Sequence, residues 1–100
     1  METLLNQLEL NLKELYRKAV DADATLQQLR QQGHGKYQQV FVNDGLFQTQ
    51  SEFFMPYLSE TAELIYLIRQ SGQFNTATLQ KIVLQLQTLH KTLAEFRTAL

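Results

Sequence analysis

The chain has 100 residues, no cysteine and a formal net charge of −1, with nine Lys and Arg against ten Asp and Glu. This length suits one domain with a single hydrophobic core. The lack of cysteine excludes disulfides, thiolate–zinc sites and cysteine nucleophiles. Tight duplex binding commonly uses about 6–10 phosphate contacts, so this charge balance argues against strong DNA binding by the domain alone.

Four Gly and one Pro favour long helices over turn-rich β architectures. The N-terminus lacks the charged-then-apolar pattern of a signal peptide. No apolar run approaches the roughly 20 residues that span a bilayer. We therefore expect a cytoplasmic, all-α protein.

The first predicted helix covers about residues 2–32. Its apolar residues recur at alternating spacings of three and four, which is the pattern of a helix that packs along one face. They are Leu5, Leu8, Leu12, Leu15, Ala19, Ala22, Leu26 and Leu29. Residues 20–25 include β-branched and short polar side chains with poor helix propensity, which predicts a bend or a break there. Gly33 suits the left-handed position after the end of the helix.

A long connection, about residues 33–51, follows the first helix. Residues 37–42 have strand-like composition, but no second strand is available to pair with them. Asn43, Asp44 and Gly45 form a turn by residue type. We expect an ordered, aromatic-rich loop that folds over one end of a helical bundle.

The second predicted helix covers about residues 52–71, with a capping box at residues 49–52. Pro56 requires either a start near Phe53 or a kink. Ser71 and Gly72 end this helix, and Asn75 caps a third helix over about residues 76–99. Only about four residues join these two helices, so they should be antiparallel neighbours. The expected fold is a three-helix antiparallel bundle in one domain over residues 1–100.

The second helix is apolar around more of its girth than the other two. Burial between its neighbours explains this breadth. The alternative is an exposed aromatic patch that docks a partner, with Phe53, Tyr57 and Tyr66 as contacts. Lys13 and Arg17, which cluster with Lys18 on the first helix, are either solvated surface or a modest basic patch for an acidic peptide tail or a nucleic-acid backbone. Lys13 and Arg17 are therefore candidate partner contacts as well.

No residue pattern indicates catalysis. Neither His34 nor His90 has a second ligand at the spacing that a metal site needs. No nucleophile lies beside a base at catalytic spacing, and no glycine-rich phosphate loop exists. We expect a protein that is not an enzyme and that uses no cofactor or metal.

Five residues of the connection form a motif ahead of the Leu-rich run at 64–68. They are Phe41, Asp44, Leu46, Phe47 and Thr49. This order resembles the PriC family (primosomal replication protein N'') of bacterial replication restart, whose members carry a phenylalanine and an aspartate shortly before Leu-Phe-x-Thr. The two are adjacent in the usual pattern, whereas two residues separate them here. The match is best over residues 41–68.

The resemblance implies a non-enzymatic helper that reloads the replicative helicase on stalled forks. It implies two protein partners, a DnaB-type helicase and the single-stranded-DNA-binding protein, with single-stranded or forked DNA bound only weakly by this domain. Family members have a second, basic helical half. The third apolar stripe still runs at Leu100, so we expect the N-terminal half of a longer protein.

Two other functions stay open. The heptad spacing of the first and third helices could form an intermolecular coiled coil, as in a homo-oligomeric adaptor unrelated to replication. A single-stranded nucleic-acid binder would use Tyr37, Phe41 and Tyr57 as stacking platforms. The replication hypothesis instead predicts a monomer whose stripes close within one chain.

Overall fold

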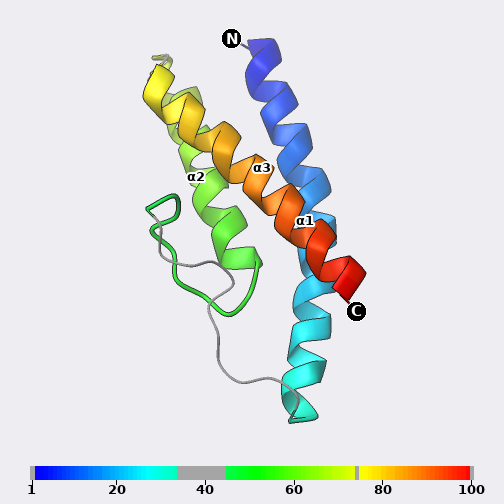
Figure 1. The fold of residues 1–100 in the computed structure, drawn as a ribbon. Coiled ribbons are helices and arrows are strands. Elements are labelled where there is room, and N and C mark those ends of the chain that lie inside the picture. The colour runs from blue at the N-terminus through cyan, green and yellow to red at the C-terminus, as the bar shows by residue number, and fades with distance from the viewer. Residues whose placement is uncertain (1, 34–44, 74, 100) are drawn as a thin grey trace.

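The computed structural model describes residues 2–33, 45–73 and 75–99, and its regular structure there is entirely helical. Three helices follow in chain order: α1 over Glu2–Gln31, α2 over Met55–Ser71 and α3 over Thr76–Ala99. Each helix packs against both others (Figure 1). The predicted all-helical class and the three-helix count are therefore confirmed. The predicted motif and loop residues Tyr37, Phe41, Asn43 and Asp44 lie outside the described ranges, as does His34.

Helix α1 is unbroken from Glu2 to Gln31, so the expected break at residues 20–25 is wrong. Two of the short polar residues there, Asp23 and Thr25, make hydrogen bonds that are compatible with an unbroken helix. The Thr25 hydroxyl donates to the Asp21 carbonyl one turn back, at 3.1 Å. The Asp23 carboxylate accepts hydrogen bonds from two backbone N–H groups at the start of the second helix. The predicted end is confirmed, because Gly33 has a φ of 78°, in the left-handed region that glycine tolerates best.

Helix α2 begins at Met55, three residues later than predicted, with Pro56 in its first turn. The predicted capping box at residues 49–52 does not cap α2, because these residues lie before the start of the helix. Phe54, which directly precedes the helix, makes no side-chain cap. The Ser51 hydroxyl instead accepts a hydrogen bond from the Phe53 N–H at 3.1 Å. The N–H groups of Phe54 and Met55 at the start of α2 donate instead to the Asp23 carboxylate of α1. Because this acceptor is remote in the sequence, the local pattern predicted the start of α2 at the wrong residue.

The junction between α2 and α3 agrees with the sequence analysis. Gly72 ends α2 with a φ of 65°, and its N–H donates to the Ile68 carbonyl at 3.0 Å. Asn75 then caps α3, because its side-chain oxygen accepts from the Thr78 N–H at 3.2 Å. A cap of this kind satisfies a backbone donor that has no partner within the helix.

The core lies where the apolar faces of the three helices meet the loop before α2. Fifteen buried apolar residues form it: Leu5, Leu8, Leu15, Ala19, Ala22, Phe47, Phe54, Tyr57, Leu58, Ile65, Ile68, Ile82, Leu86, Leu89 and Leu93. Most of the predicted stripes of α1 and α3 are therefore inside the molecule. Helix α2 is buried on one broad face, but its Tyr66 and Leu67 are exposed.

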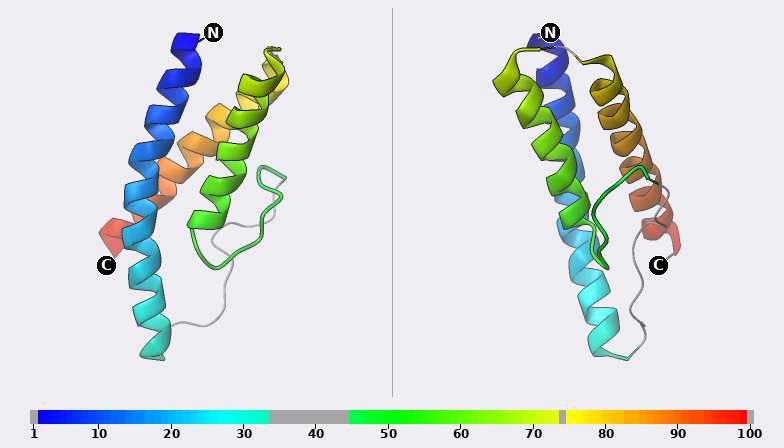
Figure 2. Two further views of the ribbon diagram at one scale, coloured as in Figure 1. Left: turned by 180° about the vertical axis from the view of Figure 1, so that it is seen from behind. Right: turned by 90° about the vertical axis from the view of Figure 1, so that its left-hand side faces the viewer.

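The loop of residues 45–54 lies against the half of α2 near its start and against α3 (Figure 2, right). Helix α1 extends beyond the start of α2 and the end of α3 (Figure 1). In the part of the chain that is described, no helix is both long and apolar enough to cross a membrane.

Candidate interaction site

The motif residues Leu46, Phe47 and Thr49 are built into the bundle. Phe47 is 5% exposed, and its ring meets the Tyr57 ring edge to face, with 5.1 Å between centroids. Such a pair contributes beyond the apolar area that it buries. Phe47 is thus a core residue of the loop.

Glu60 on α2 fastens this loop through both oxygens of its carboxylate. One oxygen accepts from the backbone N–H and from the hydroxyl of Thr49, each at 2.7 Å. The other accepts from the Gln48 N–H and from the Gln85 side-chain amide, both at 3.1 Å. Burial alone would raise the pKa of Glu60, but the hydrogen bonds from Thr49, Gln48 and Gln85 outweigh it, so the pKa lies below the ordinary 4.5.

Gln85 on α3 completes the attachment. Its amide nitrogen also donates to the Leu46 carbonyl at 2.8 Å, and its amide oxygen accepts from the Thr61 hydroxyl at 2.7 Å. Gln85 and Thr61 are fully buried, and buried polar groups of this kind are costly unless they are bonded. We call Leu46, Thr49, Glu60 and Gln85 the loop clamp. It joins the motif loop to two helices at once.

Tyr57 was a candidate partner contact, and the structure corrects this. Its side chain is 0% exposed. Its hydroxyl accepts from the Ser51 N–H at 2.9 Å and donates to the Ser51 carbonyl at 3.1 Å. A ring that packs on Phe47, with its polar tip already bonded, serves the fold and has no free surface for a partner or for a nucleic-acid base.

Phe53 is half-buried beneath Arg30 of α1. The guanidinium carbon of Arg30 lies 4.9 Å from the centre of the Phe53 ring, which is a cation–π contact. Arg30 also pairs with Glu52, at 3.2 Å from its carboxylate and 3.2 Å from its carbonyl. These contacts fix the chain just before α2, so only part of Phe53 is available to a partner.

Tyr66, Lys13 and Arg17 are exposed, as partner contacts have to be. Tyr66 is 59% exposed. Neither cation makes a hydrogen bond or ion pair with any residue of the described ranges. Three of the five candidate contacts predicted from the sequence therefore lie on the surface.

Helix spacing brings Tyr66 and Lys13 toward one face, and Arg17 follows Lys13 by one turn of α1. Arg69, three residues after Tyr66 on α2, bonds Glu2 at 2.6 Å and also pairs with Glu9 of α1. Tyr66 therefore lies on the flank of α2 that borders α1, and Lys13 lies one turn after Glu9 on the adjoining flank of α1.

We call Lys13, Tyr16, Arg17 and Tyr66 the α1–α2 face. Tyr16 belongs to it because it stands midway, by heptads, between two residues of α1 that contact α2, Glu9 and Asp23. Tyr16 is 52% exposed. Sequence reasoning missed it, although a tyrosine at the edge of the leucine stripe was an available signal.

The described part of the chain holds no group of three His, Asp or Glu residues that could bind a metal ion. No family model, curated protein or solved structure matches the chain. The relation to the PriC family therefore stays a prediction that depends on the motif.

Proposed function

We propose that this chain is a non-catalytic accessory domain of bacterial replication restart, as its resemblance to the PriC family implies. Its mechanism is recruitment, because a docking domain that holds a DnaB-type helicase near a stalled fork raises the local concentration of that helicase. The observation that carries the proposal is the exposure of the α1–α2 face, with Tyr66 at 59% and Tyr16 at 52%. The described motif residues Leu46, Phe47 and Thr49, by contrast, are engaged inside the fold.

The chemistry of the α1–α2 face suits a protein partner. Tyrosine combines a large apolar ring with a polar tip, and it is enriched among the residues that dominate binding energy. Lys13 and Arg17 add two positive charges without a described counter-ion, and these charges favour an acidic partner surface. We propose the single-stranded-DNA-binding protein as a second partner, weak contact with single-stranded or forked DNA, and a cytoplasmic location.

We also propose that the three helices form an antiparallel bundle and that the aromatic-rich connection packs on one end of it. Two contacts support the direction of the helices. Asp23 of α1 meets the start of α2, and Glu2 at the beginning of α1 meets Arg69 in the last turn of α2. The burial of Phe47 and Phe54 supports the packing of the connection.

A pull-down of purified DnaB-type helicase and of single-stranded-DNA-binding protein by this chain tests the function. We expect Tyr66→Ala and Lys13→Glu each to weaken retention of the helicase by about tenfold, the size of a strong contact residue. Leu84→Ala and Lys91→Glu, which change exposed positions on α3, are the matched controls and should leave retention unchanged.

Failure of the unaltered chain to retain either partner would refute the function. Equal losses in the α1–α2 face variants and in the α3 controls would refute the assigned face.

The burial of Tyr57 removes one of three stacking platforms expected for a single-stranded nucleic-acid binder. The homo-oligomeric adaptor stays the alternative. The mass of the protein in solution distinguishes this adaptor from a monomeric recruitment domain.

A further inference from the structure

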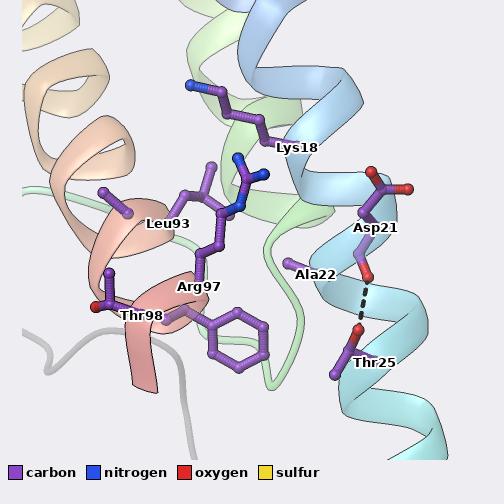
Figure 3. Close-up of a pocket in the computed structure, with 9 residues that line it drawn as sticks. Lys18, Asp21, Ala22, Thr25, Leu93, Arg97 and Thr98 are labelled. Atoms are coloured by element: carbon purple, nitrogen blue, oxygen red, sulfur yellow. Dashed lines mark hydrogen bonds between the residues drawn. The ribbon is translucent and has the colours of Figure 1, made fainter. Parts of the chain in front are cut away.

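A second surface feature lies away from the α1–α2 face. It is a cleft of about 420 Å³ between the middle of α1 and the last turns of α3 (Figure 3). Its apolar lining comes from Ala22 and Leu93, which are buried, and from Phe96, which is half-buried. Cavities that bury ligand groups commonly have about 300–1,000 Å³, so the cleft is large enough to receive side chains of a partner.

Two cations from different helices line the cleft, Lys18 from α1 and Arg97 from α3. Arg97 is exposed and makes no hydrogen bond or ion pair with any described residue. Among the described residues, Lys18 pairs only with Glu14, one turn back at 3.6 Å, and the two side chains are 46% and 63% exposed. An exposed pair of this kind is weak, so both cations are available to an incoming anion.

Asp21 is the one carboxylate among the residues that line the cleft. In Figure 3 its carboxylate lies beside α1, well apart from the Lys18 amine and the Arg97 guanidinium. The two cations come from the two helices that border the cleft. With two cations against one carboxylate, the lining combines an apolar floor with a net positive charge, which complements a ligand that is both apolar and acidic.

The shape of the cleft favours a helix over an extended peptide. Lys18, Ala22 and Thr25 of α1 follow each other at spacings of four and three, which forms a ridge about 10 Å long. Leu93 and Arg97 form a second ridge on α3. A groove between two such ridges fits a further helix. An extended peptide binds most readily by joining a sheet edge, and the described residues form no strand.

We propose that this cleft receives one face of an acidic amphipathic helix from a partner protein. Apolar side chains at i, i+3 or i+4, and i+7 of that helix lie over Ala22, Leu93 and Phe96. Its carboxylates pair with Lys18 and Arg97. The proposal depends on the proposed function only in that the partner is a protein.

The test titrates three designed 18-residue peptides into the isotope-labelled chain and follows the backbone amide signals by NMR. The first peptide is an amphipathic helix of Leu and Glu, the second has the same composition in scrambled order, and the third has Lys in place of Glu. We expect saturable shifts at Ala22, Thr25, Ala94 and Thr98 with the first peptide. The other two peptides should bind at least about tenfold more weakly, and added salt should weaken the first.

Two variants locate the binding. Arg97→Glu should weaken the amphipathic acidic peptide by about tenfold. Lys91→Glu makes a comparable charge reversal at an exposed position on the same helix, outside the cleft lining, and should change affinity by less than about twofold. Ala94→Phe fills the cleft from an exposed position without changing charge, and it should also abolish binding while thermal stability is kept.

The cleft proposal is overturned if the first peptide does not bind, if the scrambled peptide binds as well, if the shifts map elsewhere, or if Lys91→Glu and Arg97→Glu act equally. These outcomes are independent of the pull-down. Failure of the unaltered chain to retain either the helicase or the single-stranded-DNA-binding protein refutes the function whatever the peptides do. A failed titration refutes the cleft even when the helicase is retained.

Discussion

At the scale of single residues, the motif that resembles PriC has a structural explanation. The Phe47 ring is in the core, the Leu46 carbonyl accepts from Gln85, and Thr49 bonds Glu60 twice. A Leu-Phe-x-Thr pattern followed by a glutamate eleven residues after its Thr is what this packing needs. These three described residues of the motif therefore mark how the loop is held, and our proposal assigns contact with partners to other residues.

Replacing Phe47 by Ala should destabilise the domain by about 3–5 kcal/mol, the usual cost of removing a buried phenylalanine ring. Urea unfolding followed by circular dichroism measures this change. Tyr66→Ala removes a ring that is 59% exposed and should change stability by less than about 0.5 kcal/mol. Unchanged unfolding of Phe47→Ala together with lost partner binding would make Phe47 a contact residue instead.

Glu60 should make stability depend on pH. Because its folded-state pKa lies below the ordinary 4.5, the carboxylate stabilises the folded chain fully above that value, and this contribution is lost as pH falls through the folded-state pKa. We expect the urea midpoint of the unaltered chain to fall as the pH is lowered below about 5.

Glu60→Gln tests this assignment. At neutral pH it should already have a lower midpoint, because an amide offers one acceptor where two were used, and its acid-dependent fall should be smaller. Glu63→Gln, at an exposed position of the same helix with no described hydrogen bond, is the control. Parallel pH curves for Glu60→Gln and the unaltered chain would contradict the role of the loop clamp.

At the scale of helices, the start of α2 is set by Asp23 of α1. The two oxygens of its carboxylate accept from the Phe54 N–H at 2.7 Å and from the Met55 N–H at 3.0 Å. This cap satisfies free donors and places negative charge at the positive end of a helix dipole. It also fixes α2 against α1, which an ordinary local cap does not do.

Asp23→Ala should therefore cost about 0.5–2 kcal/mol, the range for loss of a helix cap. Hydrogen exchange should accelerate at the Phe54 and Met55 amides while the middle of α2 stays protected. Asp21→Ala, two residues away on the same helix, removes an exposed carboxylate with no described hydrogen bond and should leave both amides unchanged. Equal exchange in the two variants would show that Asp23 does not cap α2.

Much of the helical structure could be predicted from the sequence, because its signals are local. The three–four spacing of leucines located α1 and α3, while Gly33, Gly72 and Asn75 marked helix ends by chemistry within a few residues. The start of α2 could not be predicted in the same way. Its capping group is 31 residues earlier in the chain, and the Thr49 to Glu52 segment offered a plausible local cap that the structure does not use.

The candidate site was less predictable for the same reason. Tyr57 and Tyr66 are chemically alike and lie on one helix, yet one is buried and the other is 59% exposed. The difference comes from the loop clamp, which brings Phe47 onto Tyr57 from ten residues before it. Lys18 and Arg97 likewise become neighbours across a cleft only after α1 and α3 have packed.

At the scale of the whole molecule, α2 is tied to α1 at both ends. Asp23 holds its start, and Arg69 in its last turn bonds Glu2 and Asn6 and pairs with Glu9. The hydrogen bonds that Arg69 donates to Glu2 and Glu9 raise the pKa of Arg69 above its ordinary value. The ties orient α2 on α1, and α3 then covers the remaining apolar faces of both.

The packing of the apolar stripes against one another within one chain predicts a monomer. An intermolecular coiled coil needs an apolar stripe on the surface, but the stripe residues Leu8 and Leu15 of α1 and Leu89 and Leu93 of α3 are all buried against other helices of the same chain. Sedimentation equilibrium at micromolar concentration should therefore give about the 11.6 kDa of one chain. The thermal midpoint should not change with protein concentration, because only an assembly is stabilised by mass action. A mass near twice that value, with a midpoint that rises with concentration, would favour the homo-oligomeric adaptor, since helices would then have to pack between chains.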